Sequence, residues 1–392
     1  METPALLLDF ALVLIAAVIG GTAFRYLKMP RVVGMLVAGI ALGPFTPGFV
    51  VKSEDIKDLA LLGAVFLMFS SGLSFDIRTF GVLGTKPFVL AGLGVGLSFV
   101  LGFALGLLVN WSMLSSIFLG LILTSTSTVL GLKLMVDLGL TDESGYELVT
   151  AAILVDDVVA LSLMTIAVGL AGPESVPPLV LIAGLVAIVG LAVLLIVVSR
   201  LTFPRILRFT DKHSPSSTVM VSVSFCLLIS FGFAMLGLPP FVGAFFAGSI
   251  VASTQQSSRV TSNMAPVTAI FMAVFFTSVG LLINPAQLVT VALIGVALVA
   301  IAVFAKMLPG MLVLRNEKGM SSRARLILAT VLVPRAEISL IIAQFGVTLG
   351  APPELLALAM IVMIVTALLP GAVAWFAKWP KVQKPASQES LS

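Results

Sequence analysis

The stretch AAILVDDVVALSLMTI, residues 151–166, places two adjacent carboxylates, Asp156 and Asp157, in the middle of an apolar run. Apolar residues flank the pair on both sides, so neither side chain can readily reach water. A charged side chain at the centre of a bilayer costs about 2.5–3.5 kcal/mol on insertion scales, and such residues usually serve a function. The pair therefore indicates a site inside a membrane-spanning helix.

The composition of the whole chain agrees with a membrane protein. Hydrophobic residues make up 59% of the 392 residues, charged residues make up 10%, and the mean hydropathy is +1.19. A soluble domain carries about 25% charged residues, so a soluble fold is excluded. The net charge of +4 comes from loop residues rather than from a face that binds nucleic acid. One cysteine and one histidine leave no constellation for an enzyme or a cofactor.

Hydropathy, punctuated by charged residues, Pro and Gly, predicts about thirteen transmembrane helices and an all-α polytopic membrane protein. An odd number of spans places the two termini on opposite sides of the bilayer. With the C-terminus in the cytoplasm, seventeen of the 22 basic residues fall inside, and Lys52 and Lys57 fall outside. Cytoplasmic loops are enriched in basic residues. This predicts a multi-pass protein of the cell membrane whose N-terminus lies outside.

An internal repeat is visible where MPRVVGMLVAGIALGP, residues 29–44, is set against LPPFVGAFFAGSIVAS, residues 238–253. One span later, Gly72 matches Gly280 at nearly the same offset. An odd number of spans separates the two units, so they should cross the membrane in opposite directions. Inverted repeats of this kind are typical of secondary transporters, whose substrate sites lie near the bilayer midplane between the repeats.

The repeat predicts how the chain is organised. We expect residues 1–392 to form a single transmembrane transporter domain. Within it, the expected parts are a first inverted repeat over 29–171, a linker helix over 177–200, a second inverted repeat over 238–377 and a short cytoplasmic tail over 378–392.

The same offset places the hydroxyl run 125–128, STST, opposite residues 333–336, VPRA, and both lie in the middle of an expected span. Pro334 lacks a backbone N–H and should break its helix. A break at 125–128 follows only from the symmetry. Broken helices at equivalent places in two inverted repeats point to an ion site, so we expect crossed broken helices here.

Two ionised carboxylates about 6 Å apart repel by roughly 3 kcal/mol at an effective dielectric near 20. At least one of Asp156 and Asp157 should therefore hold a proton, a cation or a lysine. Lys306 lies alone in the apolar segment AVFAKMLPG and is the expected partner of Asp156. Two readings of Lys306 stay open, because it could either release a proton when a cation draws Asp156 away or form a permanent structural salt bridge.

Other polar residues within the spans have structural or functional readings. Thr126 and Ser127 offer oxygen ligands to a hard cation such as sodium, although an isolated hydroxyl run more often makes interhelical hydrogen bonds. Arg335 and Glu337 are expected to form a charge pair that holds helices together. Lys133 is also counted among the charges within the expected spans.

These segments together resemble the cation:proton antiporter-2 family, and within it the NapA-type sodium/proton antiporters. The resemblance is carried by five segments spread over almost the whole chain: TSTSTVLGLKLMVDLG, AAILVDDVVAL, FVGAFFAGSIVAS, FAKML and VPRAEISLI. It implies the sodium/proton antiporter fold, thirteen spans, a homodimer, and a dimerisation domain beside a mobile core that moves like an elevator.

Residue by residue, the resemblance implies that Asp157 binds the ion and that Asp156 pairs with Lys306. It further implies that Thr126 and Ser127 lie at the unwound crossing, and that Glu337 with Arg335 stabilises the core. The sequence departs from the family at Ala336-Glu337-Ile338, where Gly-Glu-Val is frequent.

The expected activity is electrogenic exchange, in which sodium or lithium leaves the cytoplasm as protons enter. Two acids and a lysine favour electrogenic exchange, since electroneutral relatives typically carry one acid after Asn or Gln. The chain ends in about fifteen polar residues, so no nucleotide-binding domain is expected. The alternatives are a potassium/proton antiporter, a sodium-coupled organic-anion symporter and, least favoured, a channel.

Overall fold

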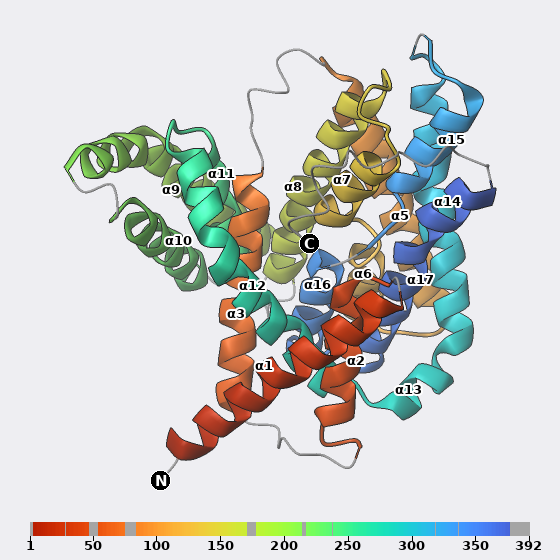
Figure 1. Cartoon of the computed structure of the whole chain (residues 1–392), viewed down its shortest axis with the longest axis horizontal. Coiled ribbons are helices and arrows are strands. Elements are labelled where there is room, and N and C mark those ends of the chain that lie inside the picture. The colour runs from red at the N-terminus through yellow and green to blue at the C-terminus, as the bar shows by residue number, and fades with distance from the viewer. Residues whose placement is uncertain are drawn as a thin grey trace. The chain divides into compact units, whose positions relative to one another are not determined.

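The computed structural model describes residues 3–27, 29–46, 54–74, 84–170, 178–213, 217–236, 238–317, 319–335 and 337–376. Within these ranges the regular structure is helical, without strands (Figure 1). The helices are α1 (Thr3–Tyr26), α2 (Arg31–Leu42), α3 (Glu54–Leu73), α5 (Lys86–Leu108), α6 (Met113–Leu121), α7 (Thr128–Asp137), α8 (Tyr146–Leu170), α9 (Pro178–His213), α10 (Thr218–Met235), α11 (Pro240–Ala252), α12 (Ser257–Leu281), α13 (Pro285–Thr290), α14 (Ala292–Leu314), α15 (Ser322–Val331), α16 (Glu337–Thr348) and α17 (Glu354–Phe376).

Seven helices of the described residues are long and apolar enough to cross a bilayer. They are Leu7–Tyr26, Lys86–Leu108, Tyr146–Val168, Thr218–Met235, Ser257–Leu281, Ala292–Leu314 and Glu354–Ala374. Several further apolar helices are shorter, among them α2, α11 and α16. The chain is thus an all-helical, multi-pass membrane protein, whereas the count of about thirteen spans stays a prediction.

Each of the two spans expected to be broken consists of two helices. One is the pair α6 and α7, and the other is the pair α15 and α16. The linker helix expected to end at 200 continues as α9 to His213, with Pro204 inside it. The charged residues after position 200 ended the hydropathy signal without ending the helix. The expected tail, 378–392, lies outside the described residues.

The chain divides into two compact units. Unit 1 contains Met1–Gly81, Leu161–Val291 and Ala343–Ala357, and unit 2 contains Val82–Ala160, Ala292–Ile342 and Leu358–Ser392. Each unit takes segments from both of the regions expected to be repeats. Neither unit therefore corresponds to one repeat, and the division follows packing rather than chain order.

Unit 1 is packed through glycines at helix crossings. A Cβ on Gly39 of α2 would lie 2.1 Å from the Thr277 carbonyl oxygen of α12. A Cβ on Gly248 of α11 would lie 2.2 Å from the Phe69 carbonyl oxygen of α3. Real atoms do not approach so closely, so only glycine permits these two backbone contacts. Small residues at close helix crossings are typical of membrane bundles.

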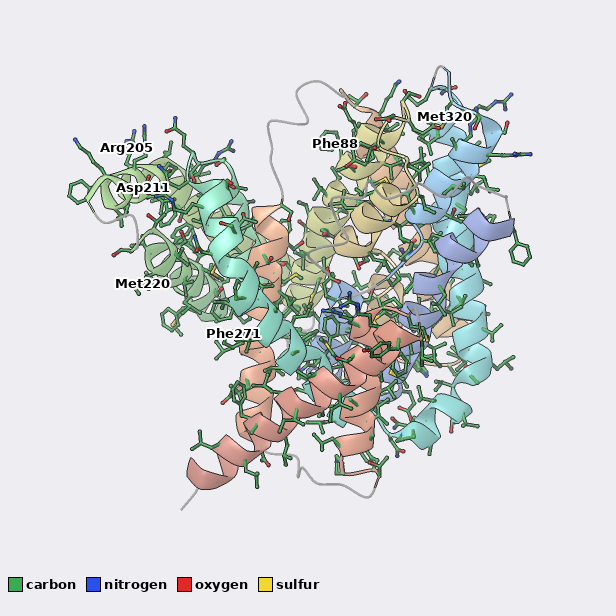
Figure 2. The ribbon with its side chains drawn as sticks, in the orientation of Figure 1. Phe88, Arg205, Asp211, Met220, Phe271 and Met320 are labelled. Atoms are coloured by element: carbon green, nitrogen blue, oxygen red, sulfur yellow. The ribbon has the colours of Figure 1, made fainter. Side chains whose placement is uncertain are left out.

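The end of α9 is attached to its neighbours within unit 1 by Asp211 (Figure 2). Its carboxylate accepts hydrogen bonds from Thr218 at 3.2 Å and from Gln256 at 3.3 Å, and it forms an ion pair with Arg259. These contacts join the last turn of α9 to the first turns of α10 and α12. They explain why the helix stays ordered beyond its apolar part.

Unit 2 has its own apolar core, to which α7, α8, α14 and α15 contribute. Its buried members include Val149 and Ile153 of α8 and Leu328 of α15, with Met320 at the edge (Figure 2). Helix α8, which also carries the aspartate pair, contributes Val149 and Ile153 to this core and is thereby packed into unit 2.

Candidate functional site

Two broken helices form the centre of unit 2. Helix α6 ends at Leu121 and α7 begins at Thr128, while α15 ends at Val331 and α16 begins at Glu337. Ser127 caps α7, because its side-chain oxygen accepts a hydrogen bond of 3.3 Å from the Leu130 N–H. Both breaks predicted from the sequence, at 125–128 and at 333–336, are therefore present.

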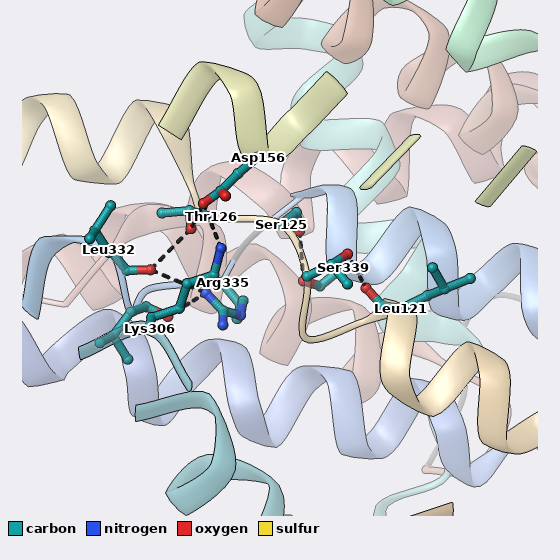
Figure 3. A network of polar contacts seen from close by, with 10 residues as sticks. Leu121, Ser125, Thr126, Asp156, Lys306, Leu332, Arg335 and Ser339 are labelled. Carbon is teal, nitrogen blue, oxygen red and sulfur yellow. Dashed lines mark hydrogen bonds and ion pairs between the residues drawn. The ribbon is translucent and has the colours of Figure 1, made fainter. Parts of the chain in front are cut away.

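The two breaks are joined to each other by hydrogen bonds (Figure 3). The Ser127 N–H donates to the Pro334 carbonyl oxygen at 2.8 Å. The Ser339 hydroxyl of α16 donates to the Ile122 carbonyl oxygen at 2.7 Å and lies 3.2 Å from the Ser125 hydroxyl. Backbone groups that a broken helix leaves without partners are expensive in a membrane. Here each break supplies partners for the other.

Asp156 and Lys306 form a buried ion pair beside this crossing (Figure 3). The Lys306 Nζ lies 2.6 Å from Asp156 Oδ2, and the two side chains are 2% and 1% exposed. The Thr126 hydroxyl lies 2.7 Å from the same carboxylate oxygen and 3.0 Å from the Leu332 carbonyl oxygen. Its one hydrogen can serve only one acceptor at a time. The expected pairing of Asp156 with Lys306 is thus present, with Thr126 as a third member.

Arg335 is fully buried and sits at the end of α15. Its Nη1 donates to the carbonyl oxygens of Leu332 at 3.2 Å and Val333 at 2.9 Å, and its backbone N–H donates to the Thr366 hydroxyl at 3.0 Å. A cation is favourable there because the last carbonyls of a helix carry partial negative charge. Arg335 is also close enough to Asp156 to interact with it electrostatically.

The expected ion pair between Arg335 and Glu337 is not among the ion pairs of the described residues. Glu337 is the first residue of α16 and is half-buried. The guanidinium turns instead toward the carbonyls that the break leaves open. A negative side chain at a helix N-terminus is stabilised by the helix itself, so Glu337 has a structural reason to be there without Arg335. The Lys133 side chain lies outside the described part of the chain.

Asp157 follows Asp156 on α8 and is equally buried, at 1% exposed. Successive residues on a helix point about 100° apart, so the two carboxylates face different neighbours. Asp157 still interacts electrostatically with Lys306. When all are ionised, the charges of Asp156, Asp157, Lys306 and Arg335 sum to zero.

This arrangement can exchange one small cation for another. Hard cations prefer oxygen ligands, and the cluster offers carboxylate, hydroxyl and carbonyl oxygens. No group of three or more His, Cys, Asp or Glu side chains that could hold a metal ion occurs among the described residues. A cluster that is neutral and fully buried suits a monovalent ion or a proton.

The helical membrane fold, the crossed broken helices and the buried charge cluster define a secondary transporter of small cations. The chain belongs to the family of transmembrane sodium/hydrogen exchangers, whose family model matches residues 13–379. The resemblance to cation/proton antiporters drawn from the sequence motifs is thereby confirmed. The family is one of transporters, not of enzymes.

Named relatives agree with this membership. The chain is 29% identical to the Na(+)/H(+)-K(+) antiporter GerN of Bacillus cereus over 92% of this chain and 94% of that protein. It is also 29% identical to the putative cation/proton antiporter YbaL of Escherichia coli over 87% of this chain. The match spans only 62% of the length of YbaL.

The fold is similar to that of the sodium proton antiporter MjNhaP1 from Methanocaldococcus jannaschii. The TM-score is 0.72 at 15% identity, and the match covers 97% of each chain. At this identity the likeness concerns the fold. It places the helical architecture among known antiporters.

Sequence reasoning missed several members of the site. Ser339 and the Leu332 and Ile122 carbonyl oxygens take part through the crossing, and Thr366 reaches Arg335 from α17. A carbonyl has no sequence signature, and a lone serine or threonine in a span is common. The matched repeat offset was the one signal that could have placed Ser339 beside the first break.

Proposed function

We propose that this protein is an electrogenic sodium/proton antiporter, also accepting lithium, that exports the cytoplasmic cation in exchange for protons. The observation that carries the proposal is the buried pair of Asp156 and Lys306, held by Thr126 at the crossing of two broken helices and adjacent to Asp157. Family membership supports cation/proton exchange as the general activity. The choice of sodium and of electrogenic coupling is our inference from the charges.

In this proposal Asp157 is the main ligand of the transported cation, and Asp156, Thr126 and Ser127 supply further oxygens. Binding of a cation draws Asp156 away from Lys306, and proton binding restores the pair. The Ser127 hydroxyl caps α7 with one lone pair and keeps another for a ligand. Arg335 holds the residues that follow α15 at the crossing. Glu337, at the start of α16, is the further charged residue that we assign to ion and proton coupling.

We further propose that the two units are the working parts of an elevator mechanism in a homodimer. Asp156, Asp157, Lys306, Arg335 and Glu337, the charges of the candidate site, lie in unit 2, which would be the mobile core. If more protons than cations move per cycle, the membrane potential contributes about 2.3 kcal/mol per net charge per 100 mV.

Inverted repeats over 29–171 and 238–377 are part of the proposal, and the glycine contacts support them. The sequence offset pairs Gly39 with Gly248 and Thr277 with Phe69. The Gly39–Thr277 and Gly248–Phe69 contacts are therefore counterparts in the two repeats. The N-terminus outside and the C-terminus in the cytoplasm follow from the distribution of basic residues.

A potassium/proton antiporter is the nearest second candidate, because the name of GerN includes both sodium and potassium. The ligand set gives no size selection by itself. Competition between the two cations in one transport assay separates the candidates. A sodium-coupled organic-anion symporter is the third, and it would show sodium uptake only with the organic solute present.

The test is transport by the purified protein in liposomes that contain a pH-sensitive dye. A sodium gradient should drive a pH change that Asp157→Ala abolishes, and a membrane potential should alter its rate. No pH change with sodium, lithium or potassium would rule out the antiporter proposal. A rate of pH change that does not vary with the membrane potential would rule out electrogenic exchange, but it would not contradict antiport.

A further inference from the structure

A glycine on α5 faces the lysine of the charge cluster. A Cβ built on Gly94 would lie 3.0 Å from Lys306 Cδ, 3.3 Å from Nζ and 3.5 Å from Cε. Three atoms of one side chain therefore lie along the α5 backbone at this point. Gly94 is itself buried, as is Lys306 on α14. The aliphatic part of the lysine occupies the space that any side chain at position 94 would need.

The lysine has little freedom to give way. Its Nζ is held at 2.6 Å by Asp156, and its side chain is 2% exposed. Helix α14 also packs closely against α15, since a Cβ on Gly310 would lie 3.0 Å from the Ala329 side chain. Closely packed interiors of this kind transmit a displacement instead of absorbing it.

We propose that Gly94 is a positioning residue, whose missing side chain forms the slot in which Lys306 lies against α5 and reaches Asp156. The inference rests on the proposed function, because the strength of the Lys306–Asp156 contact then sets how readily a cation can take Asp156. A larger residue at position 94 loosens that contact and favours the cation.

The size of the effect follows from the geometry. Ordinary van der Waals contact begins near 3.4 Å, so an alanine at position 94 requires Lys306 Cδ to move by about 0.4 Å from its 3.0 Å approach. If the ion pair lengthens by that amount from 2.6 Å, its attraction at an effective dielectric near 20 weakens by about fourfold in equilibrium constant. Gly94→Ala should therefore lower the apparent KM for sodium by about fourfold.

The competing explanation is that Gly94 only lets α5 and α14 pack closely. The chain offers matched controls, because Gly92 and Gly96 lie on the same helix, are exposed, and have no atom within 4 Å of an added Cβ. Alanine at any of the three positions raises helix propensity equally. Only alanine at position 94 should touch the lysine.

The first experiment measures sodium-driven pH change in liposomes against sodium concentration for Gly92→Ala, Gly94→Ala and Gly96→Ala. We expect a KM near one quarter of the unmodified value for Gly94→Ala alone, with the two controls unchanged. A Gly94→Ala variant whose KM equals that of the controls overturns the proposal.

A second experiment does not need transport. Thermal unfolding in detergent is compared for Gly94→Ala in the native background and with Lys306→Ala, which lacks Cδ, Cε and Nζ, the three atoms that an added Cβ would meet. We expect Gly94→Ala to lower the melting temperature in the native background and not to lower it beside Lys306→Ala. Equal effects in both backgrounds would mean helix packing alone and refute the positioning role. Absence of antiport in the unmodified protein would refute the proposed function, yet this comparison would still decide the role of Gly94.

Discussion

The buried ion pair gives a prediction whose size can be worked from the structure. At the observed separation of 2.6 Å and an effective dielectric near 20, Lys306 and Asp156 attract each other by about 6 kcal/mol. Desolvation of both groups offsets much of this attraction. Removing one partner of a buried pair nevertheless costs about 3–5 kcal/mol, because the other charge is left uncompensated.

We therefore expect Lys306→Gln and Asp156→Asn each to destabilise the protein by about 3–5 kcal/mol. The double variant should regain most of that loss, because a neutral amide pair leaves neither of these two charges without its partner and can still hydrogen-bond. The coupling energy from the double-mutant cycle should accordingly be several kcal/mol, well above the roughly 0.5 kcal/mol expected for independent sites.

The assay is thermal unfolding of the four purified proteins in one detergent, in sodium-free buffer at one pH. Thr366→Val provides a control in unit 2, because its hydroxyl contacts the Arg335 N–H and not the pair. Its effect should add to that of Lys306→Gln. A double variant as unstable as the sum of its two single variants would refute the reasoning, since Lys306 and Asp156 would then contribute independently.

Three further predictions concern residues around the site and in unit 1. Thr126→Val should lower Vmax/KM for sodium about tenfold or more, since a hydrogen bond to a charged group contributes about 1.5–3 kcal/mol. Thr126→Ser keeps the hydroxyl and should retain activity. Equal loss of activity in both variants would contradict a role for the hydroxyl. Gly72→Ala places a Cβ 2.1 Å from the Phe245 carbonyl oxygen and should prevent recovery of monodisperse protein by size-exclusion chromatography, whereas Gly371→Ala meets open space and should not. Arg259→Ala removes a partly exposed ion pair with Asp211, so the melting temperature and transport rate should change little, and a large loss would show that this end of α9 matters more than its exposure indicates.

The charged part of the site could be predicted from the sequence because the membrane makes it conspicuous. The apolar neighbours make four charged residues conspicuous: Asp156, Asp157, Lys306 and Arg335. Because burying a charge in a membrane is costly, each is expected either to pair with another charge or to take part in ion transport. The two helix breaks were also predictable, one from Pro334 and the other from the repeat offset. The first break has its physical cause in the local sequence, because proline lacks a backbone N–H, whereas the second was predicted from symmetry alone.

The partners of these charges could not be predicted in the same way. The carbonyl oxygens that receive Arg335 exist as free acceptors only once α15 has ended, and any residue type can supply them. The pairing of Arg335 with Glu337 relied on opposite charge and proximity in sequence, whereas the structure aims the guanidinium at the end of its own helix. The role of Gly94 could not be predicted from the sequence, because the contact with Lys306 depends on how α5 and α14 meet.

The division into two units was likewise out of reach of hydropathy. A long apolar segment signals burial in lipid or protein without saying which helix it contacts. The close contacts at Gly39 and Gly248 are tertiary facts, and the sequence offers only the small residues that allow them. The repeat offset indicated which contacts should be counterparts, but not that each unit combines segments of both regions.

The bond from the Ser127 N–H to the Pro334 carbonyl oxygen joins the two breaks through main-chain atoms alone. Every residue except proline can donate that bond from position 127, and every residue can accept it at position 334. Replacement of a hydroxyl side chain at the crossing therefore leaves this link in place. If Thr126 and Ser127 bind the cation as proposed, substitutions at these two positions would change the ligand set without removing the main-chain link, which makes them the natural start for engineering selectivity.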